Sequence, residues 1–108
     1  MTVVTVFKDS NDVYLGFSCS GHAGYARAGE DIVCSAVSVL TINTINSISS
    51  FTDARFSLES HEESGHLEML LETPADAGAE LLMKSLVLGL QGIQDNYQGY
   101  ITLNFKEV

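Results

Sequence analysis

Two side chains in the first third of the chain are able to carry out covalent chemistry together. His22 and Cys34 lie twelve residues apart, and a thiolate is the reactive form of cysteine. An imidazole that accepts the thiol proton completes the nucleophile-and-base pair of covalent catalysis. Gly24, Gly29 and several alanines lie between them and predict a mobile loop that can fold back and bring the imidazole to the sulfur.

A helix is expected to position the cysteine. Asp31 is a good N-cap, and the apolar spacing that follows predicts a helix from Ile32 to about residue 51. Cys34 would then lie about three positions inside the helix start, where the helix dipole and free amides favour an anion. The amides of Cys34 and its neighbours could also hold an oxyanion. Asp31 either orients His22 or only caps the helix.

Each of these residues also has a purely structural interpretation. A single cysteine near a helix start is more often a small core residue than a nucleophile. Cys19 shares one face of its predicted strand with Val13, Leu15 and Phe17, which predicts a core position. A disulfide between Cys19 and Cys34 is not expected in a reducing cytosol. Arg27, the one basic residue of the loop, either meets a substrate carbonyl or carboxylate or is solvated.

The remaining elements are predicted from alternation, turn residues and capping signals. Residues 2–8 and 13–20 form a hairpin around Asp9-Ser10-Asn11-Asp12, and residues 54–60 and 65–72 form a second hairpin. Thr73 and Pro74 open a second helix as its cap and first residue. The expected core stripe of that helix is Ala75, Ala79, Leu82, Leu86, Leu90 and Ile93. A last strand spans residues 100–106.

The order of elements is therefore ββαββαβ. Such an order predicts an α+β domain with a mainly antiparallel sheet and two helices packed on it. With 108 residues and 11.7 kDa, the chain is too short for two independent cores, so residues 1–108 are expected to form one domain. Hydrophobic residues make up 45% and charged residues 18% of the chain, which argues against intrinsic disorder.

Charge and polarity restrict the class of partner. The net charge of −9 argues against direct nucleic-acid binding and favours a basic protein partner. Gly21-His22-Ala23-Gly24 matches a Gly-x-x-Gly pattern of RNA-binding loops, but the match is short and the acidic balance opposes it. No charged residue lies between Asp31 and Asp53, which raises the question of a membrane span. The many serines, threonines and asparagines in that run argue against membrane insertion.

The same uncharged run indicates an interface between protein molecules. A surface helix normally carries charge on its outer face, and small uncharged polar faces suit close packing against a second protein. We therefore predict a homodimer; the alternative is a helix covered by its own chain.

The ends of the chain and its cysteines bear on the cellular location. The N-terminus has the pattern of a strand rather than of a signal peptide, and two cysteines are too few for a disulfide framework. A cytoplasmic location is the expectation.

A metal site is the weakest of the alternatives. His61 and His66, together with Glu62 and Glu63, lie across a predicted hairpin turn. They lack the tight ligand spacing of a zinc site and are expected to be solvated. We expect no metal and no cofactor.

Two strings resemble a known family of enzymes. They are Gly21-His22-Ala23 and Gly29-Glu30-Asp31-Ile32-Val33-Cys34-Ser35-Ala36-Val37-Ser38. Together they closely resemble the ribosomal-processing cysteine proteases called Prp, whose length and ββαββαβ order also match. Members of this family remove a short N-terminal extension from a large-subunit ribosomal protein. The resemblance therefore implies a cysteine endopeptidase with a basic ribosomal protein as its substrate.

The resemblance also implies roles for single residues. It makes Cys34 the nucleophile and His22 the general base, and it implies a homodimer. Asp31 matches the acidic position of the family, and Gly21 and Ser38 match further motif positions. Ser38 lies one helical turn beyond Cys34, on the same side of the helix, so it can help to shape the site. The alternative function is a non-catalytic, ribosome-associated protein-binding module.

Overall fold

The chain folds into one five-stranded sheet and two long helices. The computed structural model describes residues 1–21, 28–61, 65–72 and 76–108, with only the backbone of residues 28–31. The elements in chain order are β1 (Thr2–Lys8), β2 (Tyr14–Ser20), α1 (Ala28–Phe51), β3 (Phe56–His61), β4 (His66–Leu71), α2 (Ala77–Asn96) and β5 (Ile101–Glu107). This order confirms the predicted ββαββαβ arrangement.

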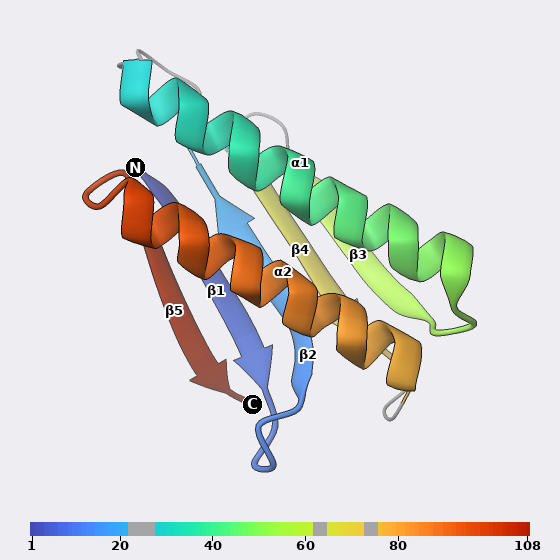
Figure 1. The fold of residues 1–108 in the computed structure, drawn as a ribbon. Coiled ribbons are helices and arrows are strands. Elements are labelled where there is room, and N and C mark those ends of the chain that lie inside the picture. The colour runs from blue at the N-terminus through green and yellow to red at the C-terminus, as the bar shows by residue number, and fades with distance from the viewer. Residues whose placement is uncertain (22–27, 62–64, 73–75) are drawn as a thin grey trace.

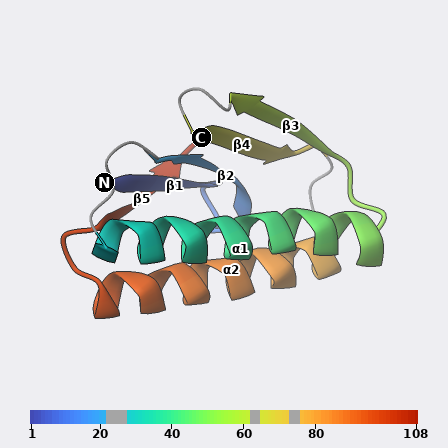
Figure 2. The same ribbon diagram turned by 90° about the horizontal axis from the view of Figure 1, so that it is seen from above.

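The sheet has the strand order β3-β4-β2-β1-β5. The pairs β1–β2, β2–β4 and β3–β4 are antiparallel, and β1–β5 is parallel. The sheet is therefore mainly antiparallel, as predicted. The parallel pair arises because α2 carries the chain back along the sheet, so that β5 starts at the same end as β1. Both helices lie side by side on one face of the sheet (Figures 1 and 2).

The core fills the layer between the helices and the sheet. Its fully buried side chains include Val4, Phe17 and Met69 from the sheet, Val33, Val37 and Ile48 from α1, and Met83 and Leu90 from α2. On α2 the buried residues are Ala79, Met83, Leu86, Val87 and Leu90. The predicted stripe therefore missed Met83 and Val87, whereas Leu82 and Ile93 lie at its partly buried margin. Ala75 lies outside the described residues.

The start of α1 differs from the prediction. The helix begins at Ala28, so Asp31 is its fourth residue and not its N-cap. Alanine is a strong helix former, and Glu30 and Asp31 place two acidic residues in the first turn, where the helix dipole favours them. These terms offset the cost of Gly29 in the helix. The helix ends at Phe51, where the sequence predicted its end.

The start of α2 also moves. Its N-cap is Asp76, whose carboxylate accepts a hydrogen bond of 2.8 Å from the backbone N–H of Ala79. Thr73 was predicted as the cap; residues 73–75 lie outside the described part of the chain. Asp and Thr are both good caps, and Asp76 is the one whose side chain meets a free N–H of the first turn.

An irregularity in β2 changes which of its side chains face the core. The register with β1 runs from Phe7 paired with Gly16 directly to Lys8 paired with Tyr14, so Leu15 is an extra residue. Tyr14 therefore packs against the core, and its ring lies 6.1 Å from that of Phe105. Strict alternation along the strand would have placed Tyr14 on the opposite face from Phe17.

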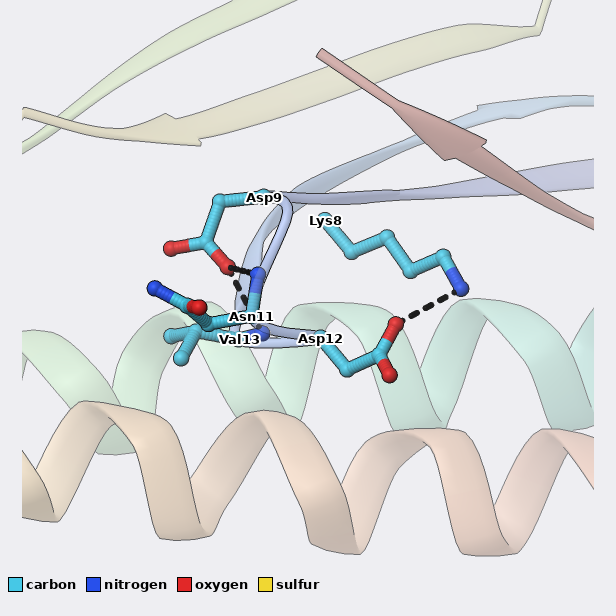
Figure 3. Close-up of polar contacts among 5 residues, drawn as sticks. All are labelled: Lys8, Asp9, Asn11, Asp12 and Val13. Carbon is cyan, nitrogen blue, oxygen red and sulfur yellow. Dashed lines mark hydrogen bonds and ion pairs between the residues drawn. The ribbon is translucent and has the colours of Figure 1, made fainter.

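The turn between β1 and β2 is held by its own side chains (Figure 3). The carboxylate of Asp9 accepts hydrogen bonds from the backbone N–H groups of Asn11, at 2.8 Å, and Val13, at 3.0 Å. Lys8 Nζ lies 2.9 Å from Asp12 Oδ1, and this hydrogen bond and charge raise the pKa of Lys8. The turn sets the register of the hairpin, and at its other end β1 begins beside the last residues of β2.

Helix α1 is long and apolar enough over Ile32–Phe51 to meet the length and hydropathy of a membrane span, with a mean hydropathy of 1.5. It is the one such helix in the described chain. Its Val33, Val37 and Ile48 are buried in the core, which is the position of a core helix in a globular fold.

Candidate functional site

A pocket of about 150 Å³ lies at the end of the sheet where β1 begins and β2 ends. The first half of α1 forms its other wall. Its lining residues are Thr2 from β1, Cys19 and Gly21 from and after β2, Cys34, Val37 and Ser38 from α1, and Gly65 before β4. Four separate segments therefore meet at one small opening that contains two thiols.

Cys34 lies in the second turn of α1 and is partly exposed to the pocket. Its Sγ lies 3.1 Å from the hydroxyl oxygen of Thr2. Because α1 begins at Ala28, the backbone N–H of Cys34 belongs to the hydrogen-bond ladder of the helix and not to its free end. The predicted position of Cys34, about three residues inside the helix start, was therefore wrong, and the structure gives no support to an oxyanion site at this amide.

Cys19 is the second thiol of the pocket and has a different environment. It packs against the hydrophobic core, in agreement with the strand pattern. Burial raises the pKa of the Cys19 thiol to about 11, and the neighbouring Cys34 adds to the effect. Both cysteines are free thiols. Cys19 is thus a protonated, weakly nucleophilic thiol at neutral pH.

Two glycines form the rim of the pocket and contact each other. The N–H of Gly21 donates to the carbonyl of Gly65 at 3.4 Å. Gly65 has φ of +64°, and a Cβ at this position would overlap the carbonyl oxygen of Gly21. A Cβ on Gly21 would lie 3.2 Å from Thr2 Oγ1. Gly65 is therefore required to lack a side chain, whereas a Cβ at Gly21 would press against the Thr2 side chain.

The structure brings some of the residues predicted from the sequence together. Gly21, Cys34 and Ser38 line one pocket, and Ser38 follows Cys34 by one helical turn. Gly29 and Asp31 belong to the first turn of α1. His22, Gly24 and Arg27 lie outside the described residues. His22 follows Gly21 directly in the chain.

Sequence reasoning did not place Thr2, Val37 and Gly65 at the site. Val37 and Gly65 had carried no distinct signal, because a buried valine and a turn glycine occur in every fold of this kind. Thr2 carried one usable sign, since it is a polar residue at a strand position whose neighbours Val4 and Val6 are apolar. Such a buried polar residue needs a partner, and the structure supplies Cys34.

The histidines of the second hairpin lie outside the pocket. His61 and His66 are paired across β3 and β4 with ring centroids 6.0 Å apart, and His61 Nε2 lies 2.9 Å from Glu59 Oε1. Within the described ranges, no group of three or more His, Cys, Asp or Glu residues is arranged to hold a metal ion. Glu62 and Glu63 lie outside those ranges.

Known proteins share this sequence pattern and this fold. The model of the family described as cysteine protease Prp matches residues 1–102. The ribosomal processing cysteine protease Prp of Staphylococcus aureus is 29% identical over 86 residues, which cover 80% of this chain and 81% of that protein. The protein of the same name from Bacillus subtilis is 24% identical over 102 residues, covering 91% of each.

Solved structures agree with the sequence comparison. An S. aureus Prp in complex with a covalently linked product peptide has a TM-score of 0.89 at 25% identity, covering 98% of this chain and all of that one. A Streptococcus mutans protein also has a TM-score of 0.89, at 27% identity, covering 100% and 96%. With the family match spanning nearly the whole sequence, the chain belongs to the cysteine protease Prp family.

Proposed function

We propose that this protein is a cysteine endopeptidase that removes the short N-terminal extension of a large-subunit ribosomal protein. The observation that carries the proposal is the pocket in which Cys34 meets Gly21, Ser38 and Thr2 in a chain of the Prp family. Support also comes from the S. aureus Prp structure, which holds a covalently linked product peptide.

In the proposed reaction, Cys34 Sγ is the nucleophile and His22 the general base. The sulfur gives its proton to the imidazole and attacks the carbonyl carbon of the scissile peptide. The proton then passes from His22 to the leaving amine, and a thioester forms on Cys34. A water activated by His22 hydrolyses the thioester and frees the enzyme. Asp31 orients the imidazole in this scheme.

The other motif residues shape the site around this chemistry. Gly21 and Ser38 form the pocket wall on either side of Cys34. Gly24, Arg27 and Gly29 lie in the sequence between Gly21 and Cys34, and we assign to them further contacts with the substrate. In this proposal Arg27 faces a carbonyl or carboxylate of the substrate. Neither a metal nor a cofactor takes part in the proposed reaction.

The net charge of −9 supports a basic substrate. Ribosomal proteins are basic, and opposite charges accelerate diffusional encounter. We expect kcat/KM for a basic substrate to fall as salt is added, because added ions screen this attraction. The same charge opposes direct binding to nucleic acid. The two free thiols support a reducing, cytoplasmic setting.

We further propose that the protein is a homodimer joined through the outer side of α1. In the described chain this side is not covered: Val39 is 67% and Ile42 51% exposed. A shallow hollow of about 320 Å³ between them is lined by Ser38, Val39, Ile42, Asn43 and Asn46. It combines apolar side chains with uncharged amides, the composition expected of an interface between identical chains.

The direct test of the protease activity is intact mass spectrometry of a peptide that copies the N-terminal extension of the host's ribosomal protein. Wild type, Cys34→Ala and His22→Ala are incubated with the peptide in parallel under reducing conditions. The expected result is one new cleavage with wild type and none with Cys34→Ala or His22→Ala. Circular dichroism of each variant checks that the fold is intact.

Cys19→Ala is the matched control because it removes the other thiol of the same pocket. Cleavage that persists in Cys19→Ala and is absent in Cys34→Ala assigns the nucleophile. If folded, reduced wild type binds the peptide without cleaving it, and the complex survives Cys34→Ser, the protein is a binding module instead.

A further inference from the structure

Thr2 occupies a position in the pocket that the catalytic scheme leaves unassigned. It is the first residue of β1, and it lies on the core side of that strand with Val4 and Val6. Its backbone is held on one side by Tyr100, whose carbonyl accepts the N–H of Thr2 at 3.2 Å, and β1 pairs Thr2 with Ile101 of β5. The side chain therefore projects from a fixed point of the sheet toward α1.

The hydroxyl of Thr2 is buried and pairs with the sulfur of Cys34. Thr2 is only 2% exposed, so bulk water does not compete for its hydroxyl. Among the described residues, the hydrogen-bond partner of Thr2 Oγ1 is Cys34 Sγ at 3.1 Å. No buried side-chain oxygen or nitrogen of the described chain lacks a partner. The pair joins two elements that are 32 positions apart in the sequence.

The direction of this hydrogen bond depends on the state of the sulfur. A thiol can donate its proton to the hydroxyl oxygen, or it can accept from the hydroxyl. A thiolate has no proton to donate, so the hydroxyl then becomes the donor. Hydrogen bonds to an ionised partner are stronger than neutral ones. The contact thus stabilises the charged sulfur more than the neutral sulfur.

We propose that Thr2 is a positioning residue for the nucleophile: its hydroxyl donates to the Cys34 thiolate, holds Sγ toward the pocket and raises the reactivity of Cys34. This inference rests on the proposed role of Cys34. Donation from Thr2 is all the more useful because Cys34 lies in the second turn of α1, beyond the free amides of the helix start.

The surroundings of Thr2 keep its hydroxyl in place. Threonine is branched at Cβ, which restricts its rotamers. Gly21 leaves the necessary room, since a Cβ there would lie 3.2 Å from Oγ1 and 3.6 Å from the methyl group of Thr2. Valine has nearly the shape of threonine without the hydroxyl, so Thr2→Val removes the hydrogen bond and leaves the volume almost unchanged.

The test compares Thr2→Val, Thr2→Ala and Thr2→Ser with wild type. The first readout is the pH dependence of Cys34 alkylation by iodoacetamide, followed by site-resolved mass spectrometry. The hydroxyl-free variants are expected to move the midpoint of this profile upward by about one pH unit, and their alkylation below the midpoint to slow roughly tenfold. Thr2→Ser is expected to return the profile toward that of wild type.

The second readout is cleavage of the substrate peptide. Thr2→Val is expected to lower kcat roughly tenfold while KM stays within about twofold, because the lost contact acts on the sulfur and not on substrate binding. Thr5→Val is the matched control: Thr5 belongs to the same strand but lies on its other face, and this variant is expected to keep the wild-type alkylation profile.

Two results overturn the proposal. One is a Thr2→Val alkylation profile that coincides with that of wild type. The other is a Thr2→Ser variant that melts like wild type but reacts as slowly as Thr2→Val. Because alkylation needs no substrate, it decides the role of Thr2 even if wild type cleaves no peptide, and absence of cleavage counts only against the protease assignment.

A measurement on the wild-type protein tests the proposal even if the variants without the hydroxyl do not fold. The Thr2 side-chain resonances in an NMR titration of wild type are expected to shift with the same midpoint as Cys34 alkylation. The shift is expected to vanish in Cys34→Ala. Resonances that do not respond across the alkylation midpoint contradict the proposal.

Discussion

Two thiols line one pocket, and their different surroundings give them different chemical properties. Cys19 belongs to the sheet and packs on the core, and its burial raises the pKa of its thiol. Cys34 belongs to α1, faces the pocket and meets the hydroxyl of Thr2. The residue type is the same, and the difference in proposed chemistry comes from burial and hydrogen bonding alone.

The raised pKa of Cys19 predicts a loss of stability in alkaline solution. The unfolded thiol titrates near 9 and the folded thiol near 11, so between these values the unfolded chain has released a proton that the folded chain retains. The free energy of unfolding therefore falls as the pH rises from about 9 to about 11. Urea unfolding of wild type and Cys19→Ala at pH 7, 9 and 10.5 checks this. Equal pH dependence in the two proteins contradicts it.

Gly65 predicts a large effect of one methyl group. Gly65→Ala is expected to lower the free energy of unfolding by about 2–4 kcal/mol, because it combines a left-handed φ with overlap on the Gly21 carbonyl. Gly99→Ala separates the two causes: Gly99 has φ of +89° but nothing within 4 Å of an added Cβ. This control is expected to lose only about 1 kcal/mol. Equal losses in urea titrations exclude the overlap.

At the scale of the elements, helix starts decide where free backbone groups lie. Cys34 would lie beside the open end of α1 if the helix began at Ile32, and it lies a full turn deeper because the helix begins at Ala28. A shift of four residues thus removes the helix terminus from the proposed chemistry. Within the described chain, the sulfur is hydrogen-bonded instead to a side-chain hydroxyl from β1, that of Thr2.

The N-cap of α2 allows the contribution of a capped backbone N–H at a helix start to be measured. Asp76→Ala is expected to lower the free energy of unfolding by about 1 kcal/mol, since it removes the acceptor of the Ala79 N–H. Asp76→Asn keeps an oxygen acceptor and is expected to lose only a few tenths of that amount. Thermal and urea unfolding measure both variants. An Asp76→Ala protein as stable as wild type would show that the hydrogen bond contributes nothing.

At the scale of the whole molecule, the two helices cover one face of the sheet and leave their own outer sides exposed (Figure 2). These sides differ in chemistry. α1 has no charged residue from Ile32 to Phe51, whereas α2 carries Glu80, Lys84 and Asp95. Uncharged surfaces lose less solvation when they are covered, so the outer side of α1 is the better surface for a second copy of the chain.

The proposed dimer predicts a difference between two exposed apolar positions. Ile42→Glu is expected to convert a dimer into a monomer, because it places a charge in the α1 interface. Leu88→Glu on α2, where Leu88 is 71% exposed, is expected to keep the dimer. Sedimentation velocity over a range of protein concentrations measures both. A monomeric wild type, or an Ile42→Glu protein that remains a dimer, contradicts the α1 interface.

The sequence by itself determined the element order, the sheet class and the family. Alternation and turn residues located the two hairpins, and the apolar spacing of α1 and α2 located the helices, because these signals depend on neighbours within a few residues. The strings around His22 and Cys34 carried the family assignment that the family model confirms. These features depend on short stretches of sequence, so they can be predicted without the tertiary structure.

Tertiary structure decided the rest. The extra residue Leu15 turned Tyr14 toward the core, and no local pattern announces such an irregularity. Helix starts depended on which of several acceptable caps found a partner, as at Asp76. Thr2 and Gly65 line the site because the starts of β1 and β4 both lie beside the end of β2. Contacts between residues far apart in the chain depend on strand register and layer packing, and these exist only in the folded molecule.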